Sequence, residues 1–189
     1  MKKRIITIGA GIAIIITIAF VITFNDNYKQ TITTSGVALS NTKIGWGVKR
    51  VPNNEQPDLG ATNVKLMKEY NGIAMGNKEK KYVYLTFDGG YEAGYTEKIL
   101  DALKENDVKA TFFITGHYLN TAGEIVQRMI EEGHVVGNHT VNHHSMPDLS
   151  EEEIKEEVVK LQTAVYEKTG YEMRYIRPPK GEYSERTLA

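Results

Sequence analysis

The chain has 189 residues, a formal net charge of −1 and 41% hydrophobic residues. These values fit one globular domain and exclude both a disordered chain and a strongly basic nucleic-acid-binding protein. Because the chain contains no cysteine, disulfides and thiolate metal sites are excluded, and a metal would have to be held by His, Asp or Glu.

The first 24 residues predict a membrane segment. Residues 5–24 carry no charge and follow Lys2, Lys3 and Arg4, and they suffice for one spanning helix at about 1.5 Å per residue. The basic flank places the N-terminus in the cytoplasm and the remainder outside, so we expect an extracytoplasmic protein, membrane-anchored or secreted. A buried core helix is the alternative. The apolar run exceeds the roughly 7–15 residues of a signal-peptide core, which favours an uncleaved anchor over a cleaved signal.

Residues 25–45 are polar and aperiodic, and they predict an exposed linker. The predicted domain covers residues 46–189. Its first part, up to Lys80, contains turn signals and isolated apolar residues, so we expect it to wrap a core rather than form one.

From Tyr82 onward, strand patterns alternate with helix patterns. Strands are predicted at residues 82–87, 108–115, 134–140 and 173–177, and helices at 95–106, 122–133 and 150–170. The last helix opens with a capping box of Ser150 and Glu153, and its acidic start is interpreted as a solvated helix end. The alternation predicts an α/β fold with a parallel sheet, either doubly wound or a β/α barrel.

Chemistry in such folds collects at the carboxyl ends of the strands. Asp88, in "YLTFDGGYEAGY", ends the first predicted strand, while His139 and Arg177 end two others. Asp88 with the glycines after it could be only a turn. Three ionisable groups at three strand ends, however, favour a shared site on one edge of the sheet.

The histidines in "NHTVNHH" suggest a metal site. His139 and His143 are four residues apart; on a helical turn both imidazoles would share one face, as in sites that bind a divalent metal. Two surface histidines would give the same pattern by chance. His144 is interpreted as a residue of the site's rim or a donor to a ligand, His117 as either a substrate contact or a structural residue, and His134 as structural.

In "RYIRPPKG", two prolines fix the backbone after Arg177. A guanidinium held in this way could orient the Asp88 carboxylate. A surface arginine before a turn is the alternative.

Together, "TFDGG", "HTVNH" and "RPPKG" resemble, in order and spacing, motifs of the polysaccharide deacetylases with NodB homology, carbohydrate esterase family 4. The segments "YLTFDGGYEAGYT", "ATFFITGHYL" and "EGHVVGN", with the upstream "WGVKR" and "PD", are similar to one subgroup, the delta-lactam-biosynthetic de-N-acetylases. The resemblance extends from Trp46 to Ala189.

The resemblance implies a partial (β/α) barrel and metal-assisted removal of the acetyl group from N-acetylmuramic acid of peptidoglycan, during formation of the spore cortex. Asp88 would be the base and Arg177 would orient it, while His139 and His143 would hold a divalent metal, preferably zinc. The implied substrate contacts are Tyr91, His117, Pro178 and Gly181. The oligomeric state, the exact acetylated sugar and the metal are not decided by the sequence.

Two departures qualify this expectation. Gly89 stands where most of the family has a ligating Asp, so we expect a weakly held metal unless Asp88 or Glu92 moves in. Residues 80–189 suffice for about four β/α units, whereas a whole barrel takes roughly 200–250 residues. We therefore expect a truncated chain, without the family's later motifs and with little activity alone. The alternative function is a non-catalytic wall-glycan binding module, in which Trp46, Tyr91 or Tyr118 could stack on sugars.

Overall fold

The computed structural model describes residues 38–189. The membrane helix predicted at residues 5–24 and most of the predicted linker lie outside the described residues. From residue 38 to the end of the chain, no helix has the length and apolar character needed to span a bilayer. The described elements are, in chain order, β1 (Ile44–Gly45), α2 (Ala61–Glu69), β2 (Thr86–Gly89), α3 (Thr96–Glu105), β3 (Thr111–Ile114), α4 (Gly116–Thr121), α5 (Gly123–Glu131), β4 (Val135–Asn138), η1 (Met146–Asp148), α6 (Glu151–Thr169), η2 (Pro179–Gly181), β5 (Glu182–Tyr183) and α7 (Glu185–Leu188).

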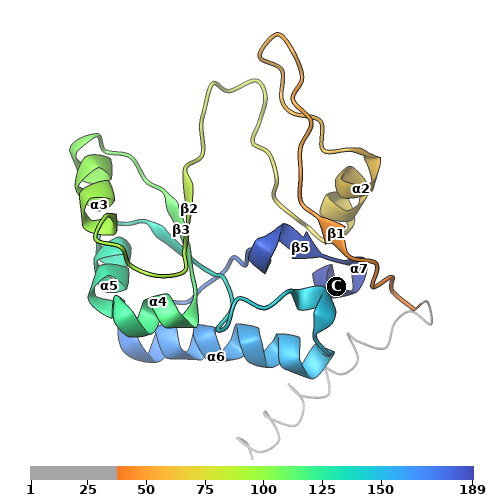
Figure 1. Ribbon diagram of the computed structural model, residues 1–189. Coiled ribbons are helices and arrows are strands. Elements are labelled where there is room, and N and C mark those ends of the chain that lie inside the picture. The colour runs from red at the N-terminus through yellow and green to blue at the C-terminus, as the bar shows by residue number, and fades with distance from the viewer. Residues whose placement is uncertain (1–37) are drawn as a thin grey trace, which may run out of the picture. The chain divides into compact units, whose positions relative to one another are not determined.

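A parallel sheet with the strand order β2-β3-β4 forms the centre of the domain (Figure 1). Helices lie between successive strands in the chain, as right-handed crossovers of parallel sheets require. After α6 the chain returns beside β4, where Ile176 makes a parallel bridge to Asn138. The predicted α/β class and parallel sheet are therefore confirmed, although the strand predicted at 173–177 is reduced to this one bridge.

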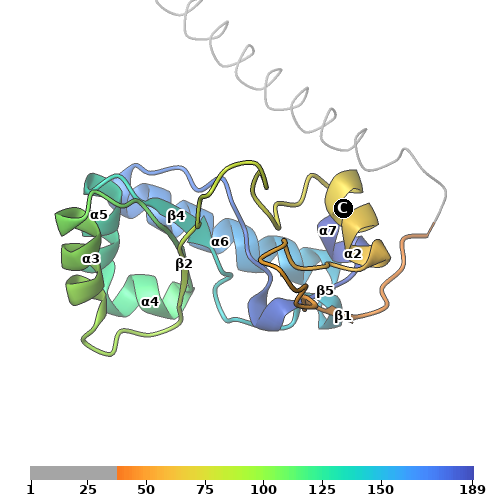
Figure 2. The same ribbon diagram turned by 90° about the horizontal axis from the view of Figure 1, so that it is seen from above.

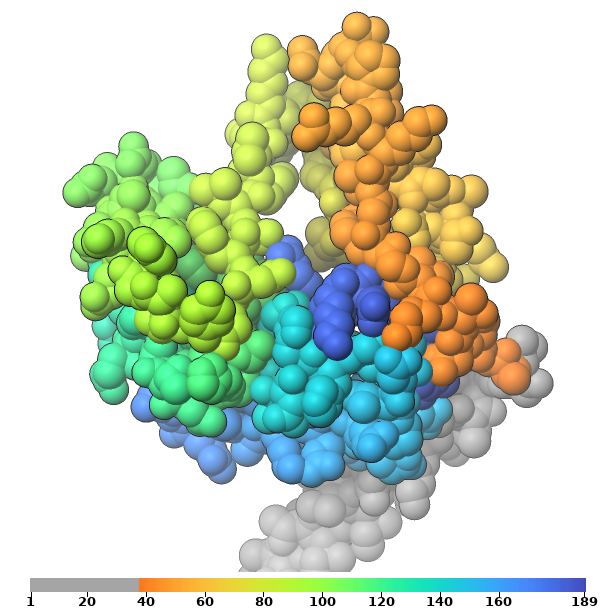
Figure 3. All heavy atoms as spheres, in the orientation of Figure 1, coloured from red at the N-terminus to blue at the C-terminus, as the bar shows by residue number. Residues whose placement is uncertain are grey.

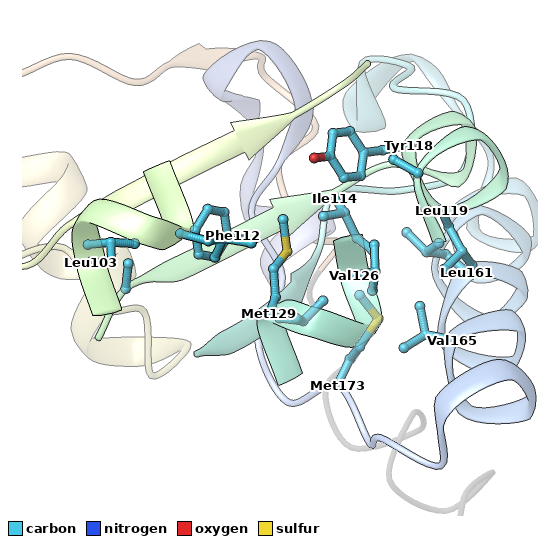
Figure 4. Packing of buried hydrophobic residues seen from close by; sticks show 14 residues of the cluster. Leu103, Phe112, Ile114, Tyr118, Leu119, Val126, Met129, Leu161, Val165 and Met173 are labelled. Carbon is cyan, nitrogen blue, oxygen red and sulfur yellow. The ribbon is translucent and has the colours of Figure 1, made fainter. Parts of the chain in front are cut away.

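One face of the sheet is covered by helices, and Figure 2 shows α3, α4 and α5 together on one side of β2. Side chains alternate between faces along a strand, so Phe112 and Ile114 of β3 enter this core while Phe113 points to the opposite face. The labelled core residues in Figure 4 come from α3, β3, α4, α5, α6 and the segment after α6: Leu103, Phe112, Ile114, Tyr118, Leu119, Val126, Met129, Leu161, Val165 and Met173.

The first strand differs from its prediction. β2 begins at Thr86, and the residues before it are exposed, with Tyr82, Val83 and Tyr84 between 66% and 86% accessible. The prediction of a buried strand is therefore wrong for residues 82–85. Within residues 38–189 no strand pairs with the outer edge of β2, so no neighbouring strand extends the sheet over this segment.

A two-stranded antiparallel pair, β1 with β5, ties the start of the described chain to its end. Trp46 donates its backbone N–H to the Gly181 carbonyl at 2.7 Å. The Lys43 ammonium contacts both Asp148 and Glu182, at 2.7 and 3.3 Å. Residues 40–45, which the sequence assigns to a linker, are thus bonded to the domain.

Helix α6 carries the capping box that the sequence predicts, with reciprocal bonds between Ser150 and Glu153. It ends at Gly170, whose φ of 71° gives the left-handed cap that favours glycine. Leu161 and Val165, four residues apart on one face of α6, are buried. The acidic start, Glu151–Glu153, is exposed as interpreted. Glu157, further along the helix, is buried at 8% exposure.

Candidate active site

A row of three residues crosses the face of the sheet opposite the helices. Asp88, Phe113 and Gly137 are partners in the β2-β3-β4 register, and partners in register point to the same face. A Cβ atom at Gly137 would lie 2.5 Å from the Phe113 ring, so the ring occupies the space that glycine leaves. The row places one carboxylate beside one aromatic ring.

Arg177 lies over this row. Its Nη1 donates to Asp88 Oδ1 at 2.6 Å, and its Nη2 donates to Thr86 Oγ1 at 2.9 Å. The guanidinium carbon is 4.3 Å from the centroid of the Phe113 ring, which is within the range of a cation–π contact. The contact predicted between Arg177 and Asp88 is present, and it leaves Asp88 Oδ2 without a bond to the guanidinium.

His139 follows β4 and is buried, at 3% exposure. Its Nδ1 lies 2.8 Å from the backbone carbonyl oxygen of Arg177. Because a carbonyl only accepts hydrogen bonds, this contact places the proton on Nδ1 and the lone pair on Nε2. Nε2 is 3.9 Å from Asp88 Oδ2. The sheet thus presents an imidazole lone pair and a carboxylate oxygen side by side.

His143 lies against His139, with ring centroids 4.8 Å apart and planes at 66°. The pKa of His143 is lowered from 6.5, first by burial and then by electrostatic interaction with His139 and Lys180, with Asp88 opposing. The helical turn expected between the two histidines is wrong. Thr140 and His143 have φ values of 67° and 58°, so two left-handed residues, not a helix, bring the rings together.

A cavity of about 590 Å³ opens beside this pair. It is lined by Asp88, Gly90, Tyr91, Thr115, Gly116, His117, Asn120, His139, Val141, Asn142 and His143. On the surface in Figure 3, the segments that contribute these residues, yellow-green, green and cyan, meet on one face. The predicted contacts Tyr91 and His117 therefore line the same cavity as Asp88 and the histidines.

Pro178 and Gly181 do not line this cavity. Gly181 has a φ of 65°, and a Cβ atom there would lie 3.1 Å from Trp46 Cβ. Its observed role is to let the chain turn against Trp46. Tyr118 is only 2% exposed, so the suggestion that it stacks on a sugar is wrong; Trp46 and Tyr91 are 42% and 72% exposed.

Residues 89–95, here called the first loop, are held by Glu92. Its Oε1 accepts backbone N–H groups of Gly94, Tyr95 and Thr96, and its Oε2 accepts the Tyr118 hydroxyl at 2.7 Å. The hydrogen bonds from Thr96 and Tyr118 lower the pKa of Glu92 to about 2, although its burial opposes them. Both oxygens of Glu92 are thus engaged in this structure, at the start of α3 and with Tyr118, and a movement of Glu92 toward a metal stays a prediction.

Residues 138–144, here called the histidine loop, are held by α6. Asn142 donates its backbone N–H to Glu157 Oε2 at 2.8 Å and its Nδ2 to Oε1 at 2.5 Å. Sequence reasoning missed Glu157. The sequence did contain a sign of its burial. Glu157 precedes Leu161 by four residues and therefore lies on the apolar face of the helix.

The two remaining histidines of the described chain lie outside the cavity lining. His144 has a 59% exposed side chain, 3.8 Å from Glu157 Oε1, which fits a residue of the rim. His134 is 3% exposed, accepts the Ala110 N–H on Nδ1 and packs edge-on against Phe112. It precedes β4 at the opposite end of the sheet, as a structural residue would.

The donor set suits a divalent metal in type but is short of ligands. His139 offers a lone pair on Nε2, and the lowered pKa of His143 favours its neutral, ligating form. Gly89 offers no side chain. Among residues 38–189, no group of three or more His, Asp or Glu side chains is placed to hold an ion. We conclude that His139 and His143 fit a metal as two imidazole ligands.

Comparison with known proteins shows the family of the chain. The family model described as polysaccharide deacetylase matches residues 75–189, more than half of the chain. The chain belongs to the polysaccharide deacetylase family. It is 41% identical over 152 residues to the peptidoglycan-N-acetylmuramic acid deacetylase PdaA of Bacillus subtilis, a match that covers 80% of this chain and 58% of PdaA.

Two solved structures of deacetylase relatives are similar in fold. The structure of Bacillus subtilis PdaA, a family 4 carbohydrate esterase, matches with a TM-score of 0.77 at 40% identity, over 79% of this chain and 64% of that one. A family 4 carbohydrate esterase from Bacillus anthracis matches with a TM-score of 0.74 at 42% identity, over 81% and 70%. The chain spans less than two thirds of the length of the curated relatives it matches, 58% for PdaA.

Proposed function

We propose that this chain forms part of a peptidoglycan deacetylase that hydrolyses the N-acetyl group of N-acetylmuramic acid. The observation that carries the proposal is the Asp88 carboxylate, fixed by Arg177 at 2.6 Å and lying 3.9 Å from the His139 Nε2 at the edge of a cavity. A base beside a metal-binding nitrogen is what amide hydrolysis by water requires.

Each residue of the site has its own role in the proposed reaction. Arg177 engages Asp88 Oδ1, so Oδ2 is left to accept a proton from water. The oxygen of that water forms a bond to the acetyl carbon, and the proton taken by Asp88 passes to the nitrogen as the carbon–nitrogen bond breaks, so that acetate and a sugar amine result. Tyr91 and His117, on the rim of the cavity, would contact the sugar. His139 and His143 would hold a divalent metal, preferably zinc, which lowers the pKa of a bound water toward about 7 and polarises the acetyl carbonyl.

Three observations support the more specific parts of the proposal, namely the sugar, the fold and the location. The similarity to PdaA, whose name gives N-acetylmuramic acid as its substrate, supports that sugar and a role in delta-lactam formation in the spore cortex. The parallel strand order, with Ile176 beside Asn138, supports a partial (β/α) barrel. The apolar residues 5–24 after a basic start support an extracytoplasmic protein, membrane-anchored or secreted.

Acetate release tests the proposal. Purified protein is incubated with glycan strands that contain N-acetylmuramic acid, with and without Zn²⁺, and compared with the variants Asp88→Asn and Asp107→Asn. Asp107 is exposed and does not line the cavity, so it provides a matched control. Because the chain spans only 58% of PdaA, we expect weak, metal-dependent acetate release, which falls about 10²- to 10⁴-fold in Asp88→Asn and is unchanged in Asp107→Asn.

The second candidate function is a non-catalytic glycan-binding module, and the missing side chain at Gly89 favours it. Glycan binding that needs no metal, together with no acetate release from the wild-type protein, would replace the deacetylase proposal with this one. Equal activity of Asp88→Asn and wild type would remove Asp88 from the base role and overturn the mechanism.

A further inference from the structure

We infer that Glu157 is a positioning residue for the site: its buried carboxylate holds the histidine loop in the conformation that keeps His143 against His139. As far as the pair binds metal, this inference rests on the proposed function. Glu157 is on α6, whereas both histidines follow β4, so the arrangement joins two elements.

Glu157 is hydrogen-bonded to two consecutive residues of the histidine loop, Val141 and Asn142, and lies near a third. The Val141 N–H donates to the Glu157 backbone carbonyl at 3.2 Å, while the backbone and side-chain amides of Asn142 donate to the two carboxylate oxygens at 2.8 and 2.5 Å. The His144 Nδ1 lies 3.8 Å from Oε1. One helical residue thus fixes the loop on both sides of Asn142, directly before His143.

The loop needs such a restraint because its backbone is unfavourable. Thr140 and His143 are left-handed, with φ values of 67° and 58°, and this region is a genuine outlier for a β-branched residue such as Thr140. Conformations of this kind persist only where the surroundings hold them, and they cluster at functional sites. Within the loop, the Thr140 hydroxyl accepts the His143 N–H at 3.1 Å, so the turn at Thr140 and the place of His143 are coupled.

The same contacts explain why residue 157 is a glutamate. The face of α6 that carries Leu161 and Val165 packs in the core, and a carboxylate there is costly unless hydrogen bonds satisfy it. Two N–H donors from Asn142 supply those bonds. Glutamine has the same shape, but its NH₂ group would face one of these donors, so only one of the two bonds could form.

Glu157→Gln therefore tests the inference, with Glu156→Gln as a matched control one residue away. Glu156 is exposed and pairs with Lys160 on the outer side of α6. In metal-free protein, we expect amide hydrogen exchange at residues 140–143 to accelerate at least tenfold in Glu157→Gln and to remain at the wild-type rate in Glu156→Gln. Unchanged exchange in Glu157→Gln would overturn the inference.

A second measurement separates positioning from simple loss of stability. Titration with Co²⁺, followed by its visible absorption and by calorimetry, should show an affinity about 10–100-fold weaker in Glu157→Gln, as for other residues that orient metal ligands. Val165→Ala, which opens a cavity in the core side of α6, should lower stability while leaving Co²⁺ affinity near that of wild type. Equal weakening in both variants would reduce Glu157 to a structural residue.

The two measurements also distinguish failure of this inference from failure of the proposed function. Wild-type protein that binds no Co²⁺ would remove the metal from the proposed function, and the exchange rates in metal-free protein would still decide whether Glu157 holds the histidine loop. Normal Co²⁺ binding with unchanged exchange in Glu157→Gln would leave the deacetylase proposal standing and refute the role of Glu157.

Discussion

The first loop and the histidine loop are both held by hydrogen bonds to a glutamate carboxylate, but the glutamate is close in sequence to one loop and distant from the other. Each depends on one glutamate that collects N–H groups. Glu92 bonds to residues two to four positions ahead of it in its own segment, whereas Glu157 reaches the histidine loop from a helix 15 residues further along the chain. A local restraint forms with the turn itself, but a distant one exists only after α6 has packed on the sheet.

The two loops also differ in what they present to the cavity. The first loop supplies the 72% exposed Tyr91 and begins with glycines. The histidine loop supplies His139, which is only 3% exposed, together with His143. The aromatic rim therefore comes from a loop held mainly within its own segment, with an added contact from Tyr118 of α4. The histidine nitrogens come from a loop that is held from α6.

The largest expected effect is that of Glu92→Ala. Loss of the acceptor for three backbone N–H groups and the Tyr118 hydroxyl should lower the free energy of unfolding by about 2 kcal/mol. Urea denaturation would measure it, with the exposed Glu97→Ala as control. NMR signals of His139 and His143 should stay in place, because the two loops are restrained separately; movement of those signals would break the comparison.

Gly89→Asp should give the first loop a metal ligand. We expect Zn²⁺ to bind about tenfold more tightly, equivalent to about 1.4 kcal/mol, as measured by calorimetry. Gly90→Asp adds the same charge one position later and is the control. A Cβ atom at position 89 would lie 3.2 Å from the Tyr118 ring. If that ring directs the new side chain away, affinity will not rise, and the metal would depend on the histidine loop alone.

A smaller effect is expected for Tyr118→Phe. The hydroxyl of Tyr118 donates to Glu92 and also lies 2.9 Å from Thr96 Oγ1, so its removal leaves a carboxylate oxygen without its donor. We expect the free energy of unfolding to fall by about 1 kcal/mol. Tyr166→Phe, at a 60% exposed position of α6, should change nothing. An equal loss in both variants would argue against the Glu92 contact.

The smallest expected effect is a dependence on pH. Folding depresses the pKa of Glu92 from 4.5 to about 2, so its contribution to stability is complete above about pH 4.5 and is lost as the pH falls toward 2. The stability difference between wild type and Glu92→Gln should therefore shrink between about pH 5 and pH 3. A difference that stays constant over this range would show that the carboxylate charge does not restrain the first loop.

Sequence reasoning succeeded where a feature is periodic or local. The alternation of elements predicted the parallel sheet, and Ser150 with Glu153 predicted the start of α6. It failed where distant neighbours decide. Residues 82–85 have a strand pattern, but no strand among the described residues covers them. The spacing of His139 and His143 suits a helix, but the fold uses two left-handed residues instead.

The sequence by itself determined the family, because its motifs are short and their residue types and spacing are printed in the chain. It also placed Asp88, His139 and Arg177 at one edge of the sheet, because the ends of parallel strands meet there. Only the tertiary structure decided how these groups face one another. The tautomer of His139 depends on the Arg177 carbonyl. The position of the Arg177 guanidinium depends on the Phe113 ring, and the conformation of the histidine loop depends on Glu157. All three are contacts between residues far apart in the sequence.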